Sequence, residues 1–191
     1  MPARKPYAVG IARRQQILEA ARELFSVRGY RGASMRDVAS QVGLTLAGVL
    51  HYFPTKEDLL AEVLQHRDDI DIPWFEDKWA ELGSFRAAMR ELMVRNMATR
   101  GVMRLFVTLS AEATDPDHPA HDFFVKRYRT SRELFSSTLA KAKARGEVSE
   151  LADGPVLIAV LDGLQVQWLI EPGFDLLAAL EAYLDTITVG R

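Results

Sequence analysis

Almost the whole chain follows the spacing of amphipathic helices, and this pattern constrains the fold more than any other feature of the sequence. Between residues 11 and 28, apolar side chains such as Ile17, Ala21, Leu24 and Phe25 recur at three- and four-residue intervals, which places them on one face of a helix. No segment sustains the alternation of apolar and polar residues that is typical of a half-buried strand. The sequence therefore predicts an all-α fold with about nine helices.

Capping residues and glycines set the expected limits of these helices. Ser34, Thr45 and Thr55 are expected to cap the second, third and fourth helices, because a side-chain oxygen there satisfies free backbone N–H groups. Gly29 and Gly101 are expected to end helices. We expect the first four helices to be short and the last five, from residue 84 onward, to be longer.

Residues 35–54 have the pattern of a helix-turn-helix. Two short helices joined by a tight turn must cross closely, which requires a small residue at the crossing and a residue that tolerates positive φ in the turn. Ala39 and Gly43 meet these two requirements. The apolar residues expected to hold the pair together are Val38, Val42, Leu44 and Val49. An ordinary helical hairpin is the alternative interpretation.

In a helix-turn-helix, the second helix enters the major groove of DNA with its N-terminal residues against the base edges. None of the residues there is an arginine, asparagine or glutamine, so DNA shape and the spacing of half-sites are expected to add to specificity. The predicted base-reading residues are Thr45, Leu46, Ala47, Gly48 and His51. The predicted phosphate contacts are Ser34, Met35, Arg36, Tyr52 and Lys56. Arg4 and Lys5 belong either to a DNA-binding arm or to a solvated tail.

The distribution of charge divides the chain into two parts. Residues 1–56 contain nine of the 24 lysines and arginines but only three of the 26 aspartates and glutamates, a net charge of +6 against −8 for the remainder. A basic module attached to an acidic one is typical of a protein that binds a polyanion through one domain. We therefore predict a DNA-binding domain at residues 1–56 and a separate helical domain at residues 57–191.

The segment Ala33–Leu60 resembles the TetR family of transcriptional regulators. The resemblance is carried by the Val38-Ala39 pair, by Gly43 in the turn, by the aromatic segment His51-Tyr52-Phe53, and by residues 55–60 with the sequence TKEDLL. The upstream helix, with Ile17, Leu24-Phe25 and Gly29-Tyr30, is similar to the first helix of that family. The sequence departs from the family at Leu50, where members often carry a tyrosine that holds a phosphate, and Tyr52 or His51 is then expected to replace it.

The resemblance implies an all-helical homodimer that binds double-stranded operator DNA. It also implies that the last two helices form a four-helix interface and that the middle helices enclose a cavity for a small-molecule inducer. Ligand binding would then move the fourth helix and change the spacing of the two DNA-binding domains.

The C-terminal part offers residues for a ligand pocket and for a dimer interface. Methionines and aromatic side chains suit a permissive apolar pocket, although a methionine stripe is also typical of an ordinary core. The pocket candidates are Met93, Met97, Phe106, Phe124, Tyr128 and Trp168. The segment Val156–Leu169 is apolar on more than one face, which favours either a dimer helix or a central core helix. In the dimer interpretation, the last helix adds Leu176, Leu177, Leu180, Tyr183 and Leu184.

Other function classes have weaker support. No glycine-rich phosphate loop, nucleophile elbow or paired-histidine metal helix occurs, so no enzyme activity, cofactor or metal is predicted. His118 and His121 flank a proline-containing turn and are expected to belong to a solvated loop. No apolar run is long enough for a membrane span or a signal peptide, so a cytoplasmic location is expected. The sequence predicts a repressor released by an apolar or amphipathic inducer; the alternative is an adaptor or small-molecule-binding protein without DNA binding.

Overall fold

The computed structural model describes residues 5–189, and nine helices account for most of them. This confirms the predicted all-α fold. The helices are α1 (Lys5–Gly32), α2 (Met35–Gln41), α3 (Leu46–Tyr52), α4 (Lys56–Leu82), α5 (Phe85–Ala98), α6 (Arg100–Glu112), α7 (His121–Ala144), α8 (Gly154–Ile170) and α9 (Leu176–Ile187). No helix within residues 5–189 is both long enough and apolar enough to cross a membrane.

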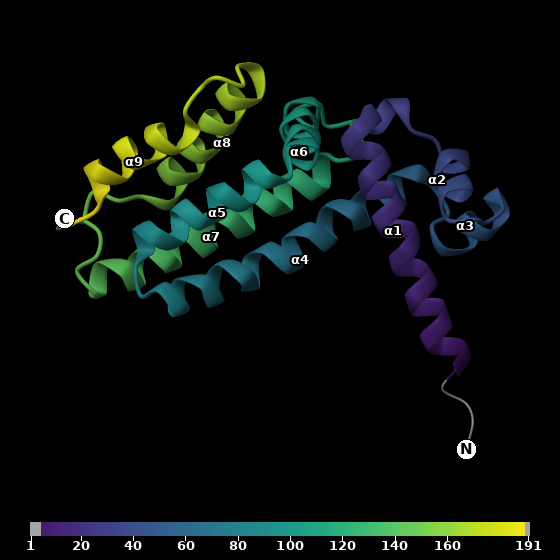
Figure 1. The fold of residues 1–191 in the computed structure, drawn as a ribbon, viewed down its shortest axis with the longest axis horizontal. Coiled ribbons are helices and arrows are strands. Elements are labelled where there is room, and N and C mark those ends of the chain that lie inside the picture. Colours follow the sequence, from purple (N-terminus) through teal and green to yellow (C-terminus); the bar gives the residue numbers. More distant parts are fainter. Residues whose placement is uncertain (1–4, 190–191) are drawn as a thin grey trace.

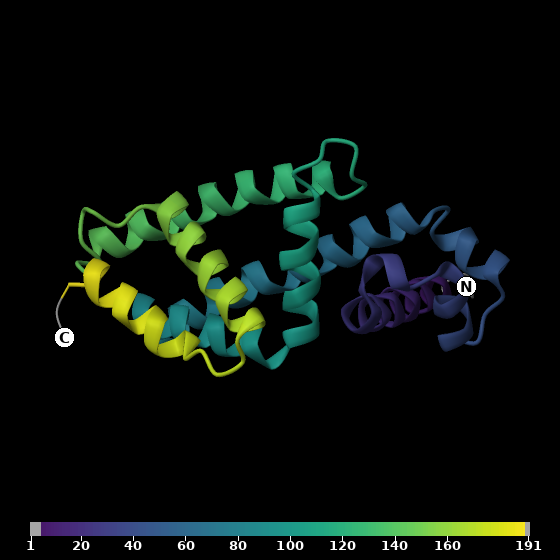
Figure 2. The same ribbon diagram turned by 90° about the horizontal axis from the view of Figure 1, so that it is seen from above.

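The molecule is elongated, with α1, α2 and α3 at one end and α8 and α9 toward the other (Figure 1). The helix α4 leaves the first end and runs along the body beside α5 and α7 (Figure 1). The view from above shows α6 standing across the direction of α4 and α7, between the two ends of the molecule (Figure 2). We call α1–α3 the head and α4–α9 the body.

Capping side chains begin the helices where the sequence predicts. Ser34 accepts a hydrogen bond from the N–H of Asp37, and the Asp37 carboxylate accepts one in return from the N–H of Ser34, which is a complete capping box. Thr55 and Asp58 form the same arrangement at the start of α4. Such caps satisfy N–H groups that the helix itself leaves free.

The expectation that the first four helices are short is wrong for two of them, since α1 has 28 residues and α4 has 27. α4 is long because each of its halves packs apolar side chains into a different core. Leu60 and Leu64 belong to the core shared with the head, whereas Phe75 and Trp79 belong to the core of the body. A helix that spans two cores gains stability from packing along its whole length.

Gly29 and Gly101 have different roles in the structure. Gly29 has a φ of 75° and interrupts the regular helix of α1, in accordance with the prediction. Gly101 does not end a helix, because the break between α5 and α6 lies at Thr99. A Cβ atom at Gly101 would lie 3.1 Å from the carbonyl oxygen of Ser26, so a glycine there allows α6 to approach α1 closely.

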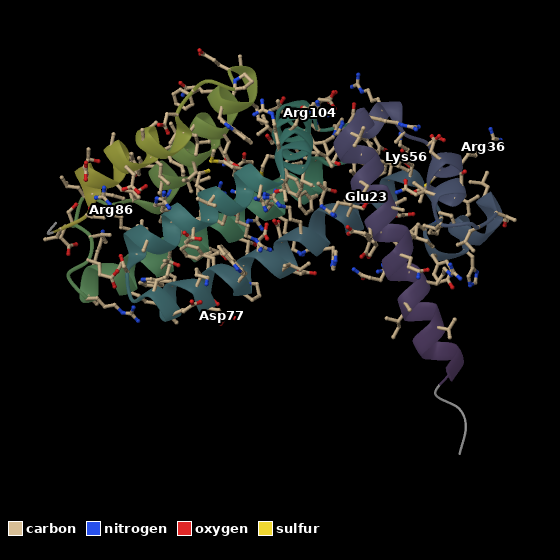
Figure 3. The ribbon with its side chains drawn as sticks, in the orientation of Figure 1. Glu23, Arg36, Lys56, Asp77, Arg86 and Arg104 are labelled. Carbon is tan, nitrogen blue, oxygen red and sulfur yellow. The ribbon has the colours of Figure 1, made fainter. Side chains whose placement is uncertain are left out.

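Arg104 of α6 binds the backbone of α1 at the same contact between head and body. Its Nη2 atom donates to the carbonyl oxygens of Ser26 (2.9 Å) and Val27 (3.1 Å), where α1 approaches its interruption at Gly29 (Figure 3). The apolar core that contains Leu60 and Leu64 also continues across this contact between α1 and α6. Its members in α6 are Val102, Leu105, Phe106 and Leu109.

Gly154 supports a prediction about the packing of α8 on α7. A Cβ atom at Gly154 would lie 2.8 Å from the backbone nitrogen of Ser136, so Gly154→Ala must push the two helices apart. We expect a loss of about 1–3 kcal/mol in the free energy of unfolding, measured by denaturant titration. Gly10→Ala is the control, because a Cβ at Gly10 would meet nothing within 4 Å. Equal stability of the two variants would contradict the close packing.

Candidate nucleic-acid interface and ligand cavity

The two helices α2 and α3 are joined by a tight turn at Gly43, which has a φ of 66°. The N–H of Leu44 donates to the carbonyl oxygen of Ala39 (2.9 Å) across this turn. Val38, Ala39 and Val49 are buried between the helices and the rest of the head. Residues 35–54 therefore adopt the predicted geometry of a helix-turn-helix.

The N-terminal end of α3 faces solvent. Thr45, Ala47 and His51 are exposed, and Leu46 and Gly48 are half-buried. The Thr45 side chain accepts a hydrogen bond from the N–H of Gly48 (3.1 Å), and its hydroxyl hydrogen can donate to another group. The five predicted base-reading residues thus share one short element whose opposite face, at Val49, is buried. A helix end placed in this way can enter a groove.

The predicted phosphate contacts at the start of α2 differ in what they can offer an anion. Ser34 is exposed, but its hydroxyl donates to the Asp37 carboxylate, which also pairs with Arg28 at 3.2 Å. Met35 is half-buried against the core of the head. Arg36 is exposed on the outer side of the head (Figure 3). Arg36 therefore supplies the accessible positive charge at this helix end.

Lys56 begins α4 next to the head (Figure 3). Its ammonium lies 4.2 Å from the centre of the Tyr30 ring, and burial lowers the pKa of the Lys56 ammonium. The Tyr30 hydroxyl donates to Glu57 (3.0 Å), and burial, followed by this bond, raises the pKa of Tyr30. The contact with the ring holds the cation in place.

The other predicted contacts are placed as follows. Tyr52 is half-buried against the core of the head and touches the exposed His51 ring, with ring centres 5.4 Å apart. Leu50, where the family often has tyrosine, is 38% exposed on α3. Arg4 and the Lys5 side chain lie outside the part of the chain that the structure describes.

A cavity of about 340 Å³ lies in the body between α4, α5, α6, α7 and α8. Of the predicted pocket residues, Phe106, Phe124 and Tyr128 line this cavity. Met93, Met97 and Trp168 do not line it, because they lie in or against the neighbouring core of the body. The volume is near the lower end for ligand pockets.

Charged groups also line the cavity, and sequence analysis missed them. Arg67 of α4 pairs with Asp71 (3.0 Å), and Arg127 of α7 pairs with Asp68. Both guanidinium groups also lie over the Phe106 ring, at 4.4 and 5.1 Å from its centre. The spacing of Arg67 and Asp71, four residues apart on one helix, was the available signal for the first pair.

Asp162 of α8 lines the same cavity. The Tyr128 hydroxyl donates to its Oδ2 atom at 2.8 Å. Burial raises the pKa of the Asp162 carboxyl group, and burial together with the nearby negative charge raises the pKa of Tyr128 to about 12. Asp162 is the one ionisable residue of α8, which was the sequence signal for a polar role.

The last two helices expose less apolar surface than the sequence suggests. Leu176, Leu180 and Leu184 of α9 are buried in the core of their own chain, so these three side chains are not exposed to a partner; the interface through the last two helices stays a prediction. Leu177 and Tyr183 are half-buried against the same core. The reason is that α9 packs one full face on α5 and α8.

One face of α8 remains exposed and carries no charge. It consists of Val156, Ala159, Gly163, Val166 and Ile170, which recur at alternating three- and four-residue intervals; Gly163 is half-buried and the others are exposed. We call these five residues the α8 stripe. Ile170 is 78% exposed, and a Cβ atom at Gly163 would meet nothing within 4 Å. Such a stripe suits packing against another helix.

The loop between α6 and α7 uses its histidines for local contacts. His118 Nδ1 accepts from the N–H of Ala120 (3.2 Å), and His121 Nδ1 lies 2.9 Å from the carbonyl oxygen of Ala113. Among the residues with described positions, no three histidine, aspartate or glutamate side chains are grouped so that they could hold a metal ion.

Comparison with known proteins identifies relatives of this chain. Residues 17–63 match the family model described as bacterial regulatory proteins, tetR family. The chain is 28% identical to the HTH-type transcriptional regulator LuxR of Vibrio harveyi, over 94% of this chain and 90% of that protein. It is 30% identical to the HTH-type transcriptional repressor KstR2 of Rhodococcus jostii, over 56% of this chain and 46% of that protein. A solved complex of SmeT with triclosan has a TM-score of 0.70 and 20% identity, over 93% of this chain and 92% of that one.

Proposed function

The chain belongs to the TetR family of bacterial regulatory proteins, and on this premise we propose that it represses transcription by binding operator DNA and is released by a small-molecule inducer. The observation that carries the proposal is the exposed N-terminal end of α3, held outward by the buried Val49 face behind a tight turn at Gly43. We assign DNA binding to residues 1–56 and ligand sensing and dimerisation to residues 57–191. Because DNA is the target, we place the protein in the cytoplasm.

DNA recognition is assigned to two groups of residues, in the head and at the start of α4. In this proposal the residues at the N-terminal end of α3 and His51 read base edges, and residues at the start of α2, at the end of α3 and at the start of α4 fix the helix on the phosphate backbone. The base-reading group is Thr45, Leu46, Ala47, Gly48 and His51. The phosphate group is Ser34, Met35, Arg36, Tyr52 and Lys56.

The inducer is assigned to the cavity, and α4 is proposed to transmit its effect. Arg67 and Asp71 of α4 line the cavity. One residue before Arg67, the Nε2 atoms of His66 and of Gln15 in α1 lie 2.8 Å apart. Nearby, Arg14 of α1 forms an ion pair with Glu62 of α4 at 2.9 Å. A ligand that shifts α4 would therefore also shift the head, and with it the spacing of two heads on an operator.

The dimer is assigned to the α8 stripe. Its three- and four-residue spacing supports packing against the same stripe of a second copy around a two-fold axis. In this dimer α9 would contribute residues other than Leu176, Leu180 and Leu184, because these leucines are buried in their own chain. Two heads related by such an axis would read two half-sites.

Lys56→Ala tests the phosphate assignment. We expect roughly tenfold weaker operator binding, because a charge-assisted hydrogen bond to phosphate is lost. The loss should be uniform across DNA sequences, and the slope of log affinity against log salt should fall by about 1 per subunit. Lys126→Ala, which removes an exposed lysine of α7, is the control for net charge. An unchanged affinity and slope for Lys56→Ala would remove Lys56 from the interface.

A gel shift with the DNA upstream of the protein's own gene, at stated salt, tests the function itself. We expect a discrete complex that competitor DNA of random sequence does not remove. An adaptor or a small-molecule-binding protein without DNA binding would leave the duplex free, and this result would overturn the proposal.

A further inference from the structure

One buried donor in the wall of the cavity has no acceptor. Of the buried polar side-chain atoms that the structure describes, two lack a hydrogen-bond partner, and one of them is Nη1 of Arg67. The other two nitrogens of this guanidinium are occupied, because Nε donates to Asp71 and Nη2 donates to Asn96 Oδ1, each at 3.0 Å. The Phe106 ring, 4.4 Å away, offsets part of the charge but offers no oxygen to Nη1. A buried N–H group without an acceptor is costly, so this position favours an oxygen supplied by a ligand.

The polar side chains next to Arg67 do not supply this acceptor. A hydrogen-bonded row continues from Asn96, whose Nδ2 donates to Gln165 Oε1 (3.5 Å), to Gln165, whose Nε2 donates to the carbonyl oxygen of Leu161 (2.9 Å). The side-chain oxygens of Asn96 and Gln165 therefore each accept a bond within the row already. Arg67, Asn96 and Gln165 all line the cavity, from α4, α5 and α8. The row thus begins with a donor that meets no oxygen of the described chain.

The charges around the cavity are balanced. Asp71 pairs with two arginines at 3.0 Å each, and Arg127 pairs with Asp68. Burial raises the pKa of the Asp162 carboxyl group, whereas the Tyr128 hydrogen bond and the positive charge of Arg127 oppose this shift. Three arginines thus face three aspartates, namely Arg67, Arg95, Arg127, Asp68, Asp71 and Asp162. A ligand of either charge would add one ion without a partner to this group, and such an ion is costly to bury.

We propose that the cavity selects a small uncharged ligand with an apolar body, whose carbonyl oxygen accepts a hydrogen bond from Nη1 of Arg67. This inference rests on the proposed function insofar as it takes the cavity as the inducer site. A neutral oxygen satisfies the free donor without disturbing the balance of charge. Because the donor belongs to a charged group, the bond is stronger than one between two neutral groups.

The surroundings of Arg67 allow such a ligand to enter. Met103 lines the cavity, and its sulfur lies 3.0 Å from Nη2 of Arg67. A methionine side chain has three rotatable bonds, so Met103 can change its conformation to let an oxygen reach the buried Nη1 atom. The apolar body of the ligand would pack against Phe75, Phe124 and Ile158, which line the same cavity of about 340 Å³.

The experiment compares three probes that share a phenylalkyl body: 4-phenylbutan-2-one, 4-phenylbutyrate and 4-phenylbutylammonium. Each is titrated into the full-length protein without DNA, and the heat of binding is measured. We expect the ketone to bind about tenfold more tightly than either ion, because an ion must leave water without gaining a partner of opposite charge. Equal or tighter binding of the carboxylate or the ammonium would overturn the proposal, as would no detectable binding of the ketone up to about 1 mM.

Arg67→Met tests the donor itself. Methionine keeps an apolar stem of similar length but has no N–H group, and Asp71 retains Arg95 as its partner. Arg95→Met is the matched control, because it removes the same charge and the other partner of Asp71 from a residue that does not line the cavity. We expect ketone binding to weaken about tenfold in Arg67→Met and to change little in Arg95→Met. Equal ketone affinities of the wild type and Arg67→Met would contradict the assignment.

The infrared spectrum of the bound ketone provides a readout that needs no variant. In the wild-type protein its carbonyl stretching band should lie at lower frequency than in an apolar solvent, because accepting a hydrogen bond from a cation weakens the C=O bond. An unshifted band would overturn the proposal even if Arg67→Met did not fold.

The failure of this inference can be distinguished from the failure of the proposed function, since the heats are measured without DNA and the gel shift without ligand. A protein that binds its operator but shows no preference for the ketone would keep the function and lose the inference.

Discussion

In the dimer proposed to form through the α8 stripe, replacing Gly163 by arginine is expected to separate the two subunits and to weaken operator binding by at least about 100-fold. Gly163 lies in the middle of the α8 stripe, between Ala159 and Val166. Residues near a two-fold axis meet their own copies, so one substitution places two cations in the same apolar contact. Two linked heads gain affinity because the second half-site binds intramolecularly, and a monomer loses this gain.

The fold of the single chain should tolerate Gly163→Arg, because nothing lies within 4 Å of a Cβ atom built there. The measurement is light scattering after size exclusion, together with gel shifts on a full operator and on one half-site. Half-site binding should change little, whereas full-site binding should fall. Ala140→Arg adds the same charge at an exposed position of α7 and should leave the dimer intact. A Gly163→Arg protein that stays dimeric would place the interface elsewhere.

The helix-turn-helix of the head could be predicted from the sequence because it depends on interactions between residues that are close in the chain. The Ser34 cap depends on Asp37 three residues away, and the turn depends on the φ of Gly43. Such features involve neighbours in the chain, so a short stretch of sequence specifies them. Sequence also predicted that the segments of the body are helices. It did not predict that the break between α5 and α6 lies at Thr99, because Gly101 allows a close contact with Ser26, a residue that is distant in sequence.

The cavity was less predictable because it is built from side chains on five helices. Periodicity correctly indicates that Met93 is buried, but it does not indicate whether Met93 faces a cavity or a packed core. Arg67 and Asp162 come together only through the crossing of α4 and α8 with α6 and α7. The leucines of α9 show the same limit, because an apolar face predicts burial but not whether the same chain or a partner covers it.

Truncating Phe53 to alanine should cost about 3–5 kcal/mol of the free energy of unfolding and should also abolish operator binding. Phe53 is 1% exposed and ends α3, where its N–H donates to the carbonyl oxygen of Val49 (3.0 Å). Its ring lies 4.8 Å from the guanidinium carbon of Arg14 in α1. Phe53 thus fixes α3 against α1, and the orientation of α3 decides whether its N-terminal end reaches the bases.

Phe85→Ala distinguishes the loss of this orientation from a general loss of stability. Phe85 is also fully buried, but it lies in the core of the body beside Trp79. Both variants should lose a similar free energy in denaturant titrations, because both remove a large side chain from a close-packed core. At a temperature where both remain folded by circular dichroism, only Phe53→Ala should fail to bind the operator. If Phe53→Leu and Phe53→Ala both bound with wild-type affinity, α3 could not be the element that reads DNA, since its support would have been removed without effect.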